Sequence, residues 1–219
     1  MPSDKSPHIE EIPPIFSYDA GVWKEYGTVA GLDEAGRGPL AGPVVASAVI
    51  LPQGLVIRGL KDSKKTSEKE RKRLFWEITS SAVSVGVGIV EADTIDRINI
   101  LQSTREAMKC ALDDLGERPA VLLIDALTLG DIQIEQRAII KGESVSASIA
   151  AASIVAKVVR DEIMMDYHEK YPAYNFRVHK GYSTKEHMEC IQTLGPCPIH
   201  RKSFRKVMDV RLPLDYDHS

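Results

Sequence analysis

The segment Ala120–Asp125, AVLLID, most constrains the fold, because it is a continuous apolar run of strand length. An unbroken apolar run is typical of a strand that other elements cover on both faces, as in α/β proteins. Thr28–Asp33 and Pro43–Leu51 have the composition of further strands, and Ala82–Val90 alternates as another. A weaker strand is expected at 132–140. The sequence therefore predicts a sheet with buried strands.

Helical patterns are interleaved with these strands. The capping box Ser67-x-x-Glu70 predicts a helix start directly after a charged loop at 59–65. Ser146–Lys170 is Ala-rich with an apolar face and predicts the strongest helix of the chain, which Pro172 ends. Shorter helices are expected at 16–26, 100–115 and 184–194. The mixture predicts an α/β domain over 16–219, preceded by a flexible segment at 1–15.

Composition limits where the protein works. The chain has three cysteines without a C-x-x-C pair, which favours reduced thiols and an intracellular setting. No apolar run reaches the roughly 18 residues of a membrane span. We therefore expect a soluble, cytoplasmic protein. Its net charge of −3 does not indicate a nucleic-acid partner, but it does not exclude one, because the position of basic residues decides phosphate binding.

Two of the expected strands end on carboxylates, Asp33-Glu34 and Asp125. In α/β sheets, functional groups collect at the carboxyl ends of strands. Carboxylates placed together raise one another's pKa unless a cation lies among them, and oxygen ligands suit Mg²⁺ or Mn²⁺. The pattern fits a two-metal site that hydrolyses a phosphodiester. It fits equally well acids that cap turns or pair with lysines.

A glycine turn, Gly36-Arg37-Gly38, follows the first acid pair. Its bare backbone could meet a ligand while Arg37 contacts phosphate or sugar; an ordinary turn is the simpler alternative. Lys64 and Lys65 lie in the loop before a helix and are candidates for phosphate contact. The basic run at 69–73 fits a solvated helix face equally well.

Two further motifs lie near the C-terminus. Tyr182, in the sequence HKGY, could present its ring to a sugar or base, or pack at the surface. Arg201 belongs to a second basic cluster at 201–206. The spacing His187-x2-Cys190-x6-Cys197-x2-His200 is similar to a zinc motif. Because turn residues fill its short central gap, we expect buried, inert thiols and no zinc.

Taken in order, these motifs resemble the ribonuclease HII family, the type 2 ribonuclease H of bacteria. The resemblance covers about residues 27–208. It is carried by GLDEAGRGPLAGPVVASAVIL at 31–51, LKDSKK at 60–65, LLIDAL at 122–127, SIAAASIVAKVVRD at 148–161, HKGY at 179–182 and GPCPIHRKSF at 195–204.

The resemblance implies a ribonuclease H-like fold, with a mixed five-stranded sheet flanked by helices and a helical C-terminal part at about 165–210. It implies an endonuclease that cuts the RNA strand of RNA–DNA hybrids, and cuts 5′ of single ribonucleotides embedded in duplex DNA. Two divalent ions, Mg²⁺ or Mn²⁺, are expected at the active site. No membrane contact is expected, and we expect a monomer.

The resemblance also assigns roles to residues. Asp33, Glu34 and Asp125 match the metal-binding carboxylates. Gly36, Arg37 and Gly38 match the turn that contacts the ribose 2′-hydroxyl, and Tyr182 matches a tyrosine that stacks on the following deoxyribose. Apart from the resemblance, Lys64, Lys65 and Arg201 are our own candidates for contacts with backbone phosphates.

The fourth acid departs from the family pattern, in which a Lys-Gly-Asp triplet is common. This chain has Lys141-Gly142-Glu143; the longer glutamate keeps the charge, and we expect Glu143 to be the fourth catalytic acid, holding a metal or its water. Two other functions remain open: a different nuclease on the same fold, such as a DNA resolvase, and a catalytically silent hybrid-binding protein.

Overall fold

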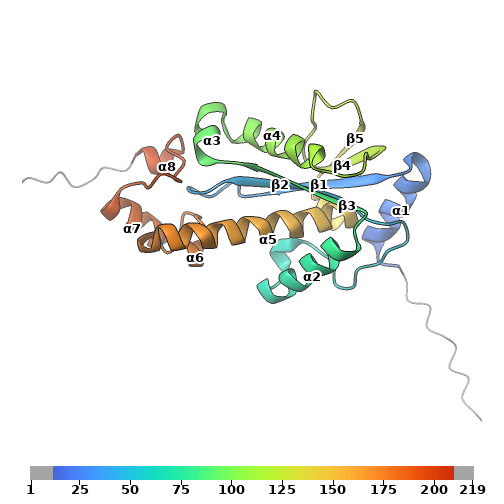
Figure 1. Cartoon of the computed structure of the whole chain (residues 1–219), viewed down its shortest axis with the longest axis horizontal. Helices are drawn as coiled ribbons and strands as arrows, with labels where there is room; N and C mark the ends of the chain where they lie inside the picture. The colour runs from blue at the N-terminus through green and yellow to red at the C-terminus, as the bar shows by residue number, and fades with distance from the viewer. Residues whose placement is uncertain (1–11, 210–219) are drawn as a thin grey trace, which may run out of the picture.

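Five strands form one mixed sheet in the order β3-β2-β1-β4-β5 (Figure 1). The computed structural model describes residues 12–209. The strands are β1 Val29–Ala35, β2 Val44–Ile50, β3 Ser84–Val90, β4 Val121–Asp125 and β5 Glu135–Ile139. β1 is central, antiparallel to β2 and parallel to β4. β2 and β3 are antiparallel, and β4 and β5 are parallel. This confirms the expected mixed five-stranded sheet.

Helices cover both faces of the sheet (Figure 1). The α-helices are α1 Pro14–Tyr26, α2 Glu68–Ser81, α3 Ala92–Ile98, α4 Ile100–Asp113, α5 Ala147–Lys170, α6 Phe176–His179, α7 Lys185–Leu194 and α8 Arg205–Met208. Short 3-10 turns are η1 Ser63–Lys65, η2 Gly142–Ser144 and η3 Pro172–Tyr174. α5 and α2 lie on one face, and α3 and α4 lie on the other (Figure 1).

The two faces of β1 are buried differently. A Cβ built on Gly31 would lie 2.1 Å from the carbonyl carbon of Ser148, so the backbones of β1 and α5 are in direct contact. Ala30 and Leu32 point the other way, into a core shared with Ala107 and Met108 of α4. Side chains alternate along a strand, so the glycine lets α5 lie close while its neighbours fill the opposite core.

The serines that were expected to cap helices do so in the structure. The Ser67 side chain accepts a hydrogen bond from the Glu70 amide, and the Ser146 hydroxyl accepts one from the Ile149 amide. Three helices were not predicted, namely α3, α6 and α8. They have seven residues at most, too few to show a 3.6-residue period.

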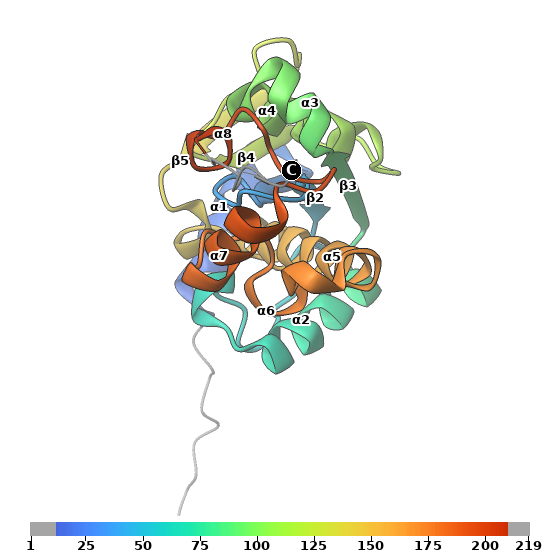
Figure 2. The ribbon, with the colours of Figure 1, turned by 90° about the vertical axis from the view of Figure 1, so that its left-hand side faces the viewer.

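The short C-terminal helices gather at one end of the sheet, where Figure 2 shows α6, α7 and α8 in front of the strands. They form the helical C-terminal part that was expected. Residues 1–11 of the expected flexible segment and the acidic end of the chain, 215–219, lie outside the described residues, and residues 14 and 15 belong to α1. No helix within residues 12–209 is long and apolar enough to cross a membrane.

Candidate active site

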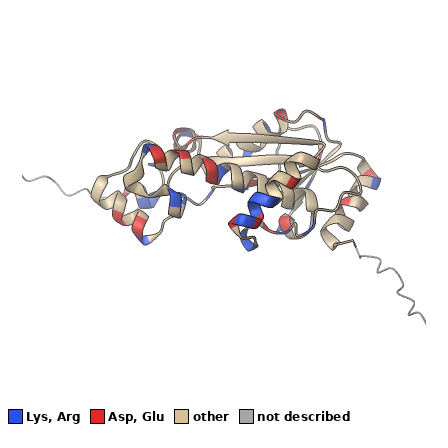
Figure 3. Cartoon of the chain, turned by 60° about the horizontal axis from the view of Figure 1, so that its bottom comes forward, with Lys and Arg blue, Asp and Glu red and all other residues tan. Residues whose placement is uncertain are grey.

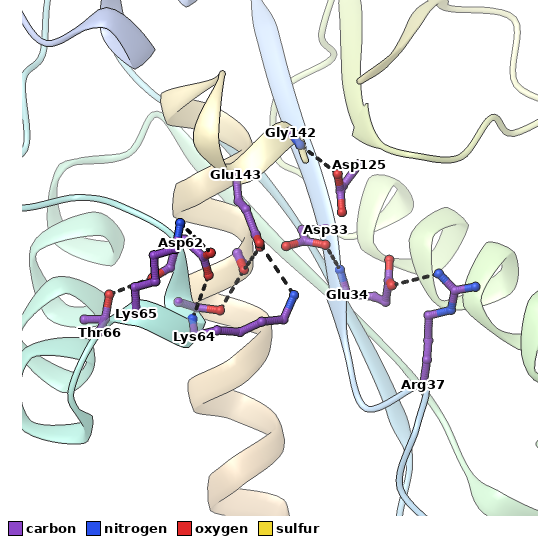
Figure 4. Close-up of polar contacts among 12 residues, drawn as sticks. Asp33, Glu34, Arg37, Asp62, Lys64, Lys65, Thr66, Asp125, Gly142 and Glu143 are labelled. Carbon is purple, nitrogen blue, oxygen red and sulfur yellow. Dashed lines mark hydrogen bonds and ion pairs between the residues drawn. The ribbon is translucent and has the colours of Figure 1, made fainter. Parts of the chain in front are cut away.

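Parallel pairing of β1 and β4 brings two carboxylates to one edge of the sheet. Leu32 pairs with Ile124, so the next residues, Asp33 and Asp125, lie abreast at the carboxyl end of β4, two residues before β1 itself ends at Ala35 (Figure 4). The Asp33 carboxylate accepts a hydrogen bond from the Glu34 amide at 2.8 Å, and Asp125 accepts one from the Gly142 amide at 2.7 Å. These backbone contacts hold both carboxylates at the strand ends.

Glu34 lies beside them but projects from the other face of β1, as the alternation of a strand requires. One of its carboxylate oxygens lies 3.3 Å from the Arg37 guanidinium. The other oxygen, Oε2, is buried and has no hydrogen-bond partner among the described residues. A buried carboxylate oxygen without a partner is costly, unless a cation or water completes it.

Glu143 reaches the same region from η2, directly after β5. Lys141, the residue before η2, has a left-handed backbone with φ 57°, which turns the chain back toward β4. The Glu143 side chain is only 9% exposed and lies 3.5 Å from the Lys64 ammonium. Its other oxygen accepts a hydrogen bond from the Ser153 hydroxyl of α5 at 3.3 Å.

The electrostatics of these acids reflect their burial. Burial, the charge of Glu34 and the charge of Asp125 raise the pKa of Asp33 well above its ordinary value. Burial also raises the pKa of Glu34, although Arg37 opposes the change. Burial raises the pKa of Glu143 against the opposing charge of Lys64. Burial thus disfavours the ionised form of these acids, and a cation bound among them would favour it.

These residues fit a divalent cation, with one adjustment. The donors are carboxylate oxygens, which suit Mg²⁺ and Mn²⁺, and the unpartnered oxygen of Glu34 is free to bind. Within residues 12–209, however, no three acidic, histidine or cysteine side chains already converge on one ion position. Glu34 is turned toward Arg37 and Glu143 toward Lys64 (Figure 4). Bringing three of these side chains to one ion therefore requires side-chain movement, in which Glu143 turns away from Lys64.

The glycine turn beside the acids is held from inside by two buried arginines. The Arg201 guanidinium donates to the carbonyls of Gly36 at 2.6 Å, Arg37 at 3.0 Å and Gly42 at 2.8 Å. Arg160 donates in the same way to the carbonyls of Ala41 and Pro43. Arg201 is completely buried, which contradicts the expected phosphate contact: its donors are used to shape the turn.

Within the turn, the three motif residues differ in exposure and space. A Cβ on Gly36 would lie 2.1 Å from the Arg160 side chain, and its φ is 98°, so this glycine is required by the fold. A Cβ on Gly38 would meet nothing within 4 Å. Arg37 is 45% exposed. Gly38 and Arg37 are therefore the members of the turn that face open space.

Lys64 and Lys65 belong to η1, directly before α2. Lys64 faces the acids, whereas Lys65 is paired with Asp62 at 3.6 Å (Figure 4). Both side chains are largely exposed, at 80% and 70%. Asp62 fixes the loop, since its carboxylate also accepts a hydrogen bond from the Lys64 amide.

The basic run on α2 is visible as a concentration of blue in Figure 3, and two of its members, Lys72 and Arg73, are paired with acids. Arg73 contacts both Glu70 and Glu77, and Lys72 lies 2.8 Å from Glu162. This arrangement fits the alternative of a solvated helix face.

Tyr182 follows α6 and is 43% exposed. Its ring lies 5.8 Å from the Lys157 ammonium and 5.7 Å from the Arg160 guanidinium, both on α5. Its main-chain neighbour Gly181 accepts a hydrogen bond from the amide of Leu40, which belongs to the loop after the glycine turn. The tyrosine and the glycine turn are therefore joined through their backbones.

Ser153 was not predicted as a site residue. Its hydroxyl contacts Glu143 and the Ser63 hydroxyl at 2.9 Å, and its hydrogen bond lowers the pKa of Asp33 against the effect of burial. The available signal was a serine seven residues after Ser146, on the same buried face of an Ala- and Ile-rich helix.

The family model and the similar curated proteins point to the same family. The family model described as ribonuclease HII matches residues 30–207. The ribonuclease HII of Acetivibrio thermocellus is 58% identical over 181 residues, which is 83% of this chain and 71% of that protein. The ribonuclease HII of Geotalea uraniireducens is 53% identical over 201 residues, which is 91% of this chain and 93% of that protein.

Solved structures agree on the fold. The ribonuclease H2 of Pyrococcus horikoshii OT3 superposes with a TM-score of 0.71 at 26% identity, covering 84% of this chain and 96% of the other. Bst-RNase HIII in complex with Mn²⁺ superposes with a TM-score of 0.66 at 21% identity, covering 83% and 68%. At that identity the second similarity supports the fold alone.

Proposed function

Since the chain belongs to the ribonuclease HII family, and is thus a ribonuclease H endonuclease of a divalent-metal enzyme family, we propose which substrates it cuts and which residues act. The proposed substrates are the RNA strand of RNA–DNA hybrids and duplex DNA with an embedded ribonucleotide, cut on its 5′ side to leave 3′-hydroxyl and 5′-phosphate ends. One observation carries the proposal: Asp33 and Asp125 meet at the sheet edge, directly beside the Gly36-Arg37-Gly38 turn.

Asp33, Glu34 and Asp125 would hold two divalent ions, Mg²⁺ or Mn²⁺, and Glu143 completes the set as a ligand or through a water. When bound, such a pair supplies an activated water for in-line attack and neutralises the departing 3′-oxygen. The protein's own part is to fix the carboxylates. The amides of Glu34 and Gly142 hold Asp33 and Asp125, and the Ser153 hydroxyl holds Glu143.

The cations that now pair with these acids have a second task in this proposal. When Glu143 turns to a metal, the Lys64 ammonium is released, and it is then placed to contact a backbone phosphate. Arg37 is released from Glu34 in the same way. Lys65 remains a phosphate candidate at the edge of the same loop.

Recognition of the ribonucleotide is assigned to the turn and to Tyr182. The 2′-hydroxyl is the group that distinguishes RNA from DNA at one position, and the open space at Gly38 allows close approach of a sugar to the backbone. The half-exposed ring of Tyr182 is proposed to stack on the next deoxyribose. We propose that the protein acts as a monomer.

The test is a metal titration on three duplexes: DNA with one ribonucleotide, a uniform RNA–DNA hybrid and all-DNA. We expect cleavage of the first two with Mg²⁺ or Mn²⁺ and none of the third. Equal cutting of all-DNA would favour a different nuclease on the same fold. Tight hybrid binding without product at any metal concentration would favour a silent binding protein.

A further inference from the structure

Three of the four residues of the zinc-like spacing, His187, Cys197 and His200, are buried, whereas Cys190 is partly exposed, so only one of the two thiols is buried as expected. His187 and His200 are at most 1% exposed, and His179 stacks on His187 with ring centroids 4.3 Å apart. Cys197 contacts Nδ1 of His200 at 3.1 Å, whereas His187 contacts Nε2 of the same ring at 3.0 Å. Because these contacts are on different ring nitrogens, Cys197, His187 and His200 cannot share one ion. Cys190 is directed to the Ala173 carbonyl.

The hydrogen-bond partners determine where each proton lies in this cluster. Nδ1 of His187 faces the Tyr182 carbonyl at 2.9 Å, and a carbonyl only accepts, so this nitrogen carries the proton. Nδ1 of His200 lies 2.9 Å from the Cys197 amide, which can only donate, and 3.2 Å from the Cys197 carbonyl. The shorter contact makes Nδ1 an acceptor, so we assign the His200 proton to Nε2. The contact between the two Nε2 atoms is then a hydrogen bond from His200 to His187. The Tyr182 carbonyl at one end of this series of hydrogen bonds and the Cys197 amide at the other end both favour this direction.

His179 completes the pattern. Its Nε2 faces the Tyr174 carbonyl at 2.7 Å and must donate, and its Nδ1 accepts from the Gly181 amide at 3.2 Å. Each of the three rings is thus neutral, with one donor and one acceptor in use. Protonation of His187 would place two N–H groups against each other at the contact with His200.

The chain of hydrogen bonds ends on the turn that carries Tyr182. Lys180 and Gly181 have left-handed backbones, with φ of 49° and 83°, a conformation that costs free energy at a lysine. The Gly181 amide is bound by His179, its carbonyl by Leu40, and the Tyr182 carbonyl by His187. Histidine side chains thus restrain the backbone on both sides of the Tyr182 α-carbon.

We propose that His187 is a positioning residue for substrate recognition: its Nδ1-protonated ring holds the Tyr182 carbonyl and thereby the Tyr182 ring, and His200 enforces that tautomer. This rests on the proposed function in so far as Tyr182 meets the substrate. Burial supports the neutral state, since it lowers the pKa of both His187 and His200 to about 4. The charges facing the cluster are mixed: Glu186 raises the pKa of His179 and His187, and Lys180 lowers that of His179.

A direct test is the side-chain ¹⁵N NMR spectrum of the full-length protein, whose sequence has six histidines. We expect the His187 signals of an Nδ1–H tautomer and the His179 and His200 signals of Nε2–H tautomers, without titration between about pH 5.5 and 8. An Nε2–H tautomer or an imidazolium at His187 in that range would overturn the proposal. This readout does not depend on substrate.

Two substitutions separate the two nitrogens of His187. An asparagine places its amide near the position of Nδ1, so His187→Asn keeps a donor for the Tyr182 carbonyl. A glutamine reaches the position of Nε2, so His187→Gln keeps the partner of His200 but loses that donor. The measurement is the ratio of cleavage rates on the single-ribonucleotide duplex and the uniform hybrid.

We expect His187→Gln to lower this ratio about fivefold to tenfold, the factor of one lost hydrogen bond, and His187→Asn to stay within about twofold. The control is Cys190→Ser, because Cys190 lies on the same helix but takes no part in the hydrogen bonds of the histidines. It should keep the ratio of cleavage rates. Equal losses in both His187 variants, or a larger loss in His187→Asn, would overturn the proposal. Circular dichroism checks folding, and the NMR result decides if either variant unfolds.

Tyr182→Ala separates this proposal from the proposed function. If Tyr182→Ala leaves the ratio unchanged, the assignment of Tyr182 to the substrate fails. The tautomer measurement then still decides whether His187 holds the turn.

Discussion

Burial raises the pKa of three single residues in the candidate site, Asp33, Glu34 and Glu143. Asp33 is the strongest case, because burial and two neighbouring carboxylates all act in the same direction. The sequence predicted Asp33, Glu34 and Asp125 as a group, since acids that end apolar strands are visible without a structure. It did not predict that Arg201 would be buried, because a basic cluster shows no sign of which member the fold encloses.

We expect Asp33→Asn to abolish cleavage and to stabilise the metal-free protein. A raised folded pKa means that the carboxyl contributes stability below its unfolded pKa of about 4, and that this is lost as pH rises through the folded pKa. The neutral amide removes that loss. Each ~1 kcal/mol gained should raise Tm by about 2–4 °C in chelator at pH 7.5. Scanning calorimetry checks this; retained Mg²⁺-dependent cutting, or a lower Tm in chelator, would contradict it.

The two glycines of the turn should respond differently to alanine. Gly38→Ala should keep stability within about 0.5 kcal/mol, because its Cβ meets nothing, but should reduce cleavage at an embedded ribonucleotide. Gly36→Ala should cost about 2–4 kcal/mol of folding free energy through its positive φ and the contact with Arg160. Urea denaturation and cleavage assays on both variants test this. Full activity in Gly38→Ala would remove that position from the substrate contact.

At the scale of elements, α5 is the main support of the site, and its sequence predicted it clearly. Ser146 caps it, and its N-terminal half packs directly on β1 through Gly31. β5 was expected only weakly, because it is an edge strand without a buried residue and with little apolar pattern. The short helices α6 and α8 depend on tertiary contacts, for which the sequence has no periodic signal.

Gly31→Ala should test the close packing of β1 on α5. The added methyl would meet backbone atoms of Ser148, which cannot move aside as a side chain can, and we expect a loss of about 3 kcal/mol or more. The matched control is Gly21→Ala in α1, where a Cβ meets nothing and alanine should stabilise the helix by about 0.5–1 kcal/mol. Equal stabilities of the two variants by urea denaturation would contradict the packing.

At the scale of the whole molecule, two groups of buried residues respond to pH with opposite sign. The acids with raised pKa, Asp33 among them, stabilise the metal-free fold as pH falls. The histidines with lowered pKa do the opposite, because only the unfolded chain takes up their protons between about pH 6.5 and 4. The overall acid sensitivity is the balance of the two groups, so a single variant must separate them.

We expect His187→Asn to flatten the pH dependence of stability. Removing one group that is neutral when folded and charged when unfolded lowers the slope by about one proton, or ~1.4 kcal/mol per pH unit, between about pH 4.5 and 6. The free energy of unfolding of both proteins, measured in urea and chelator across this range, provides the difference. Parallel curves would show that His187 takes up no proton on unfolding.

The contacts of α5 have a consequence for the length of the chain. Ser153 contacts Glu143, one of the acids. Arg160 binds the carbonyls of Ala41 and Pro43, in the loop whose Leu40 amide donates to Gly181 beside Tyr182. One helix therefore carries both contact residues, seven positions apart. Inserting one residue between them would turn the second of them by about 100° and advance it by about 1.5 Å. The number of residues between Ser153 and Arg160 thus fixes the distance and angle between the acids and the turn that carries Tyr182. Insertions and deletions that keep activity should fall outside 153–160, for example in the loop 126–134.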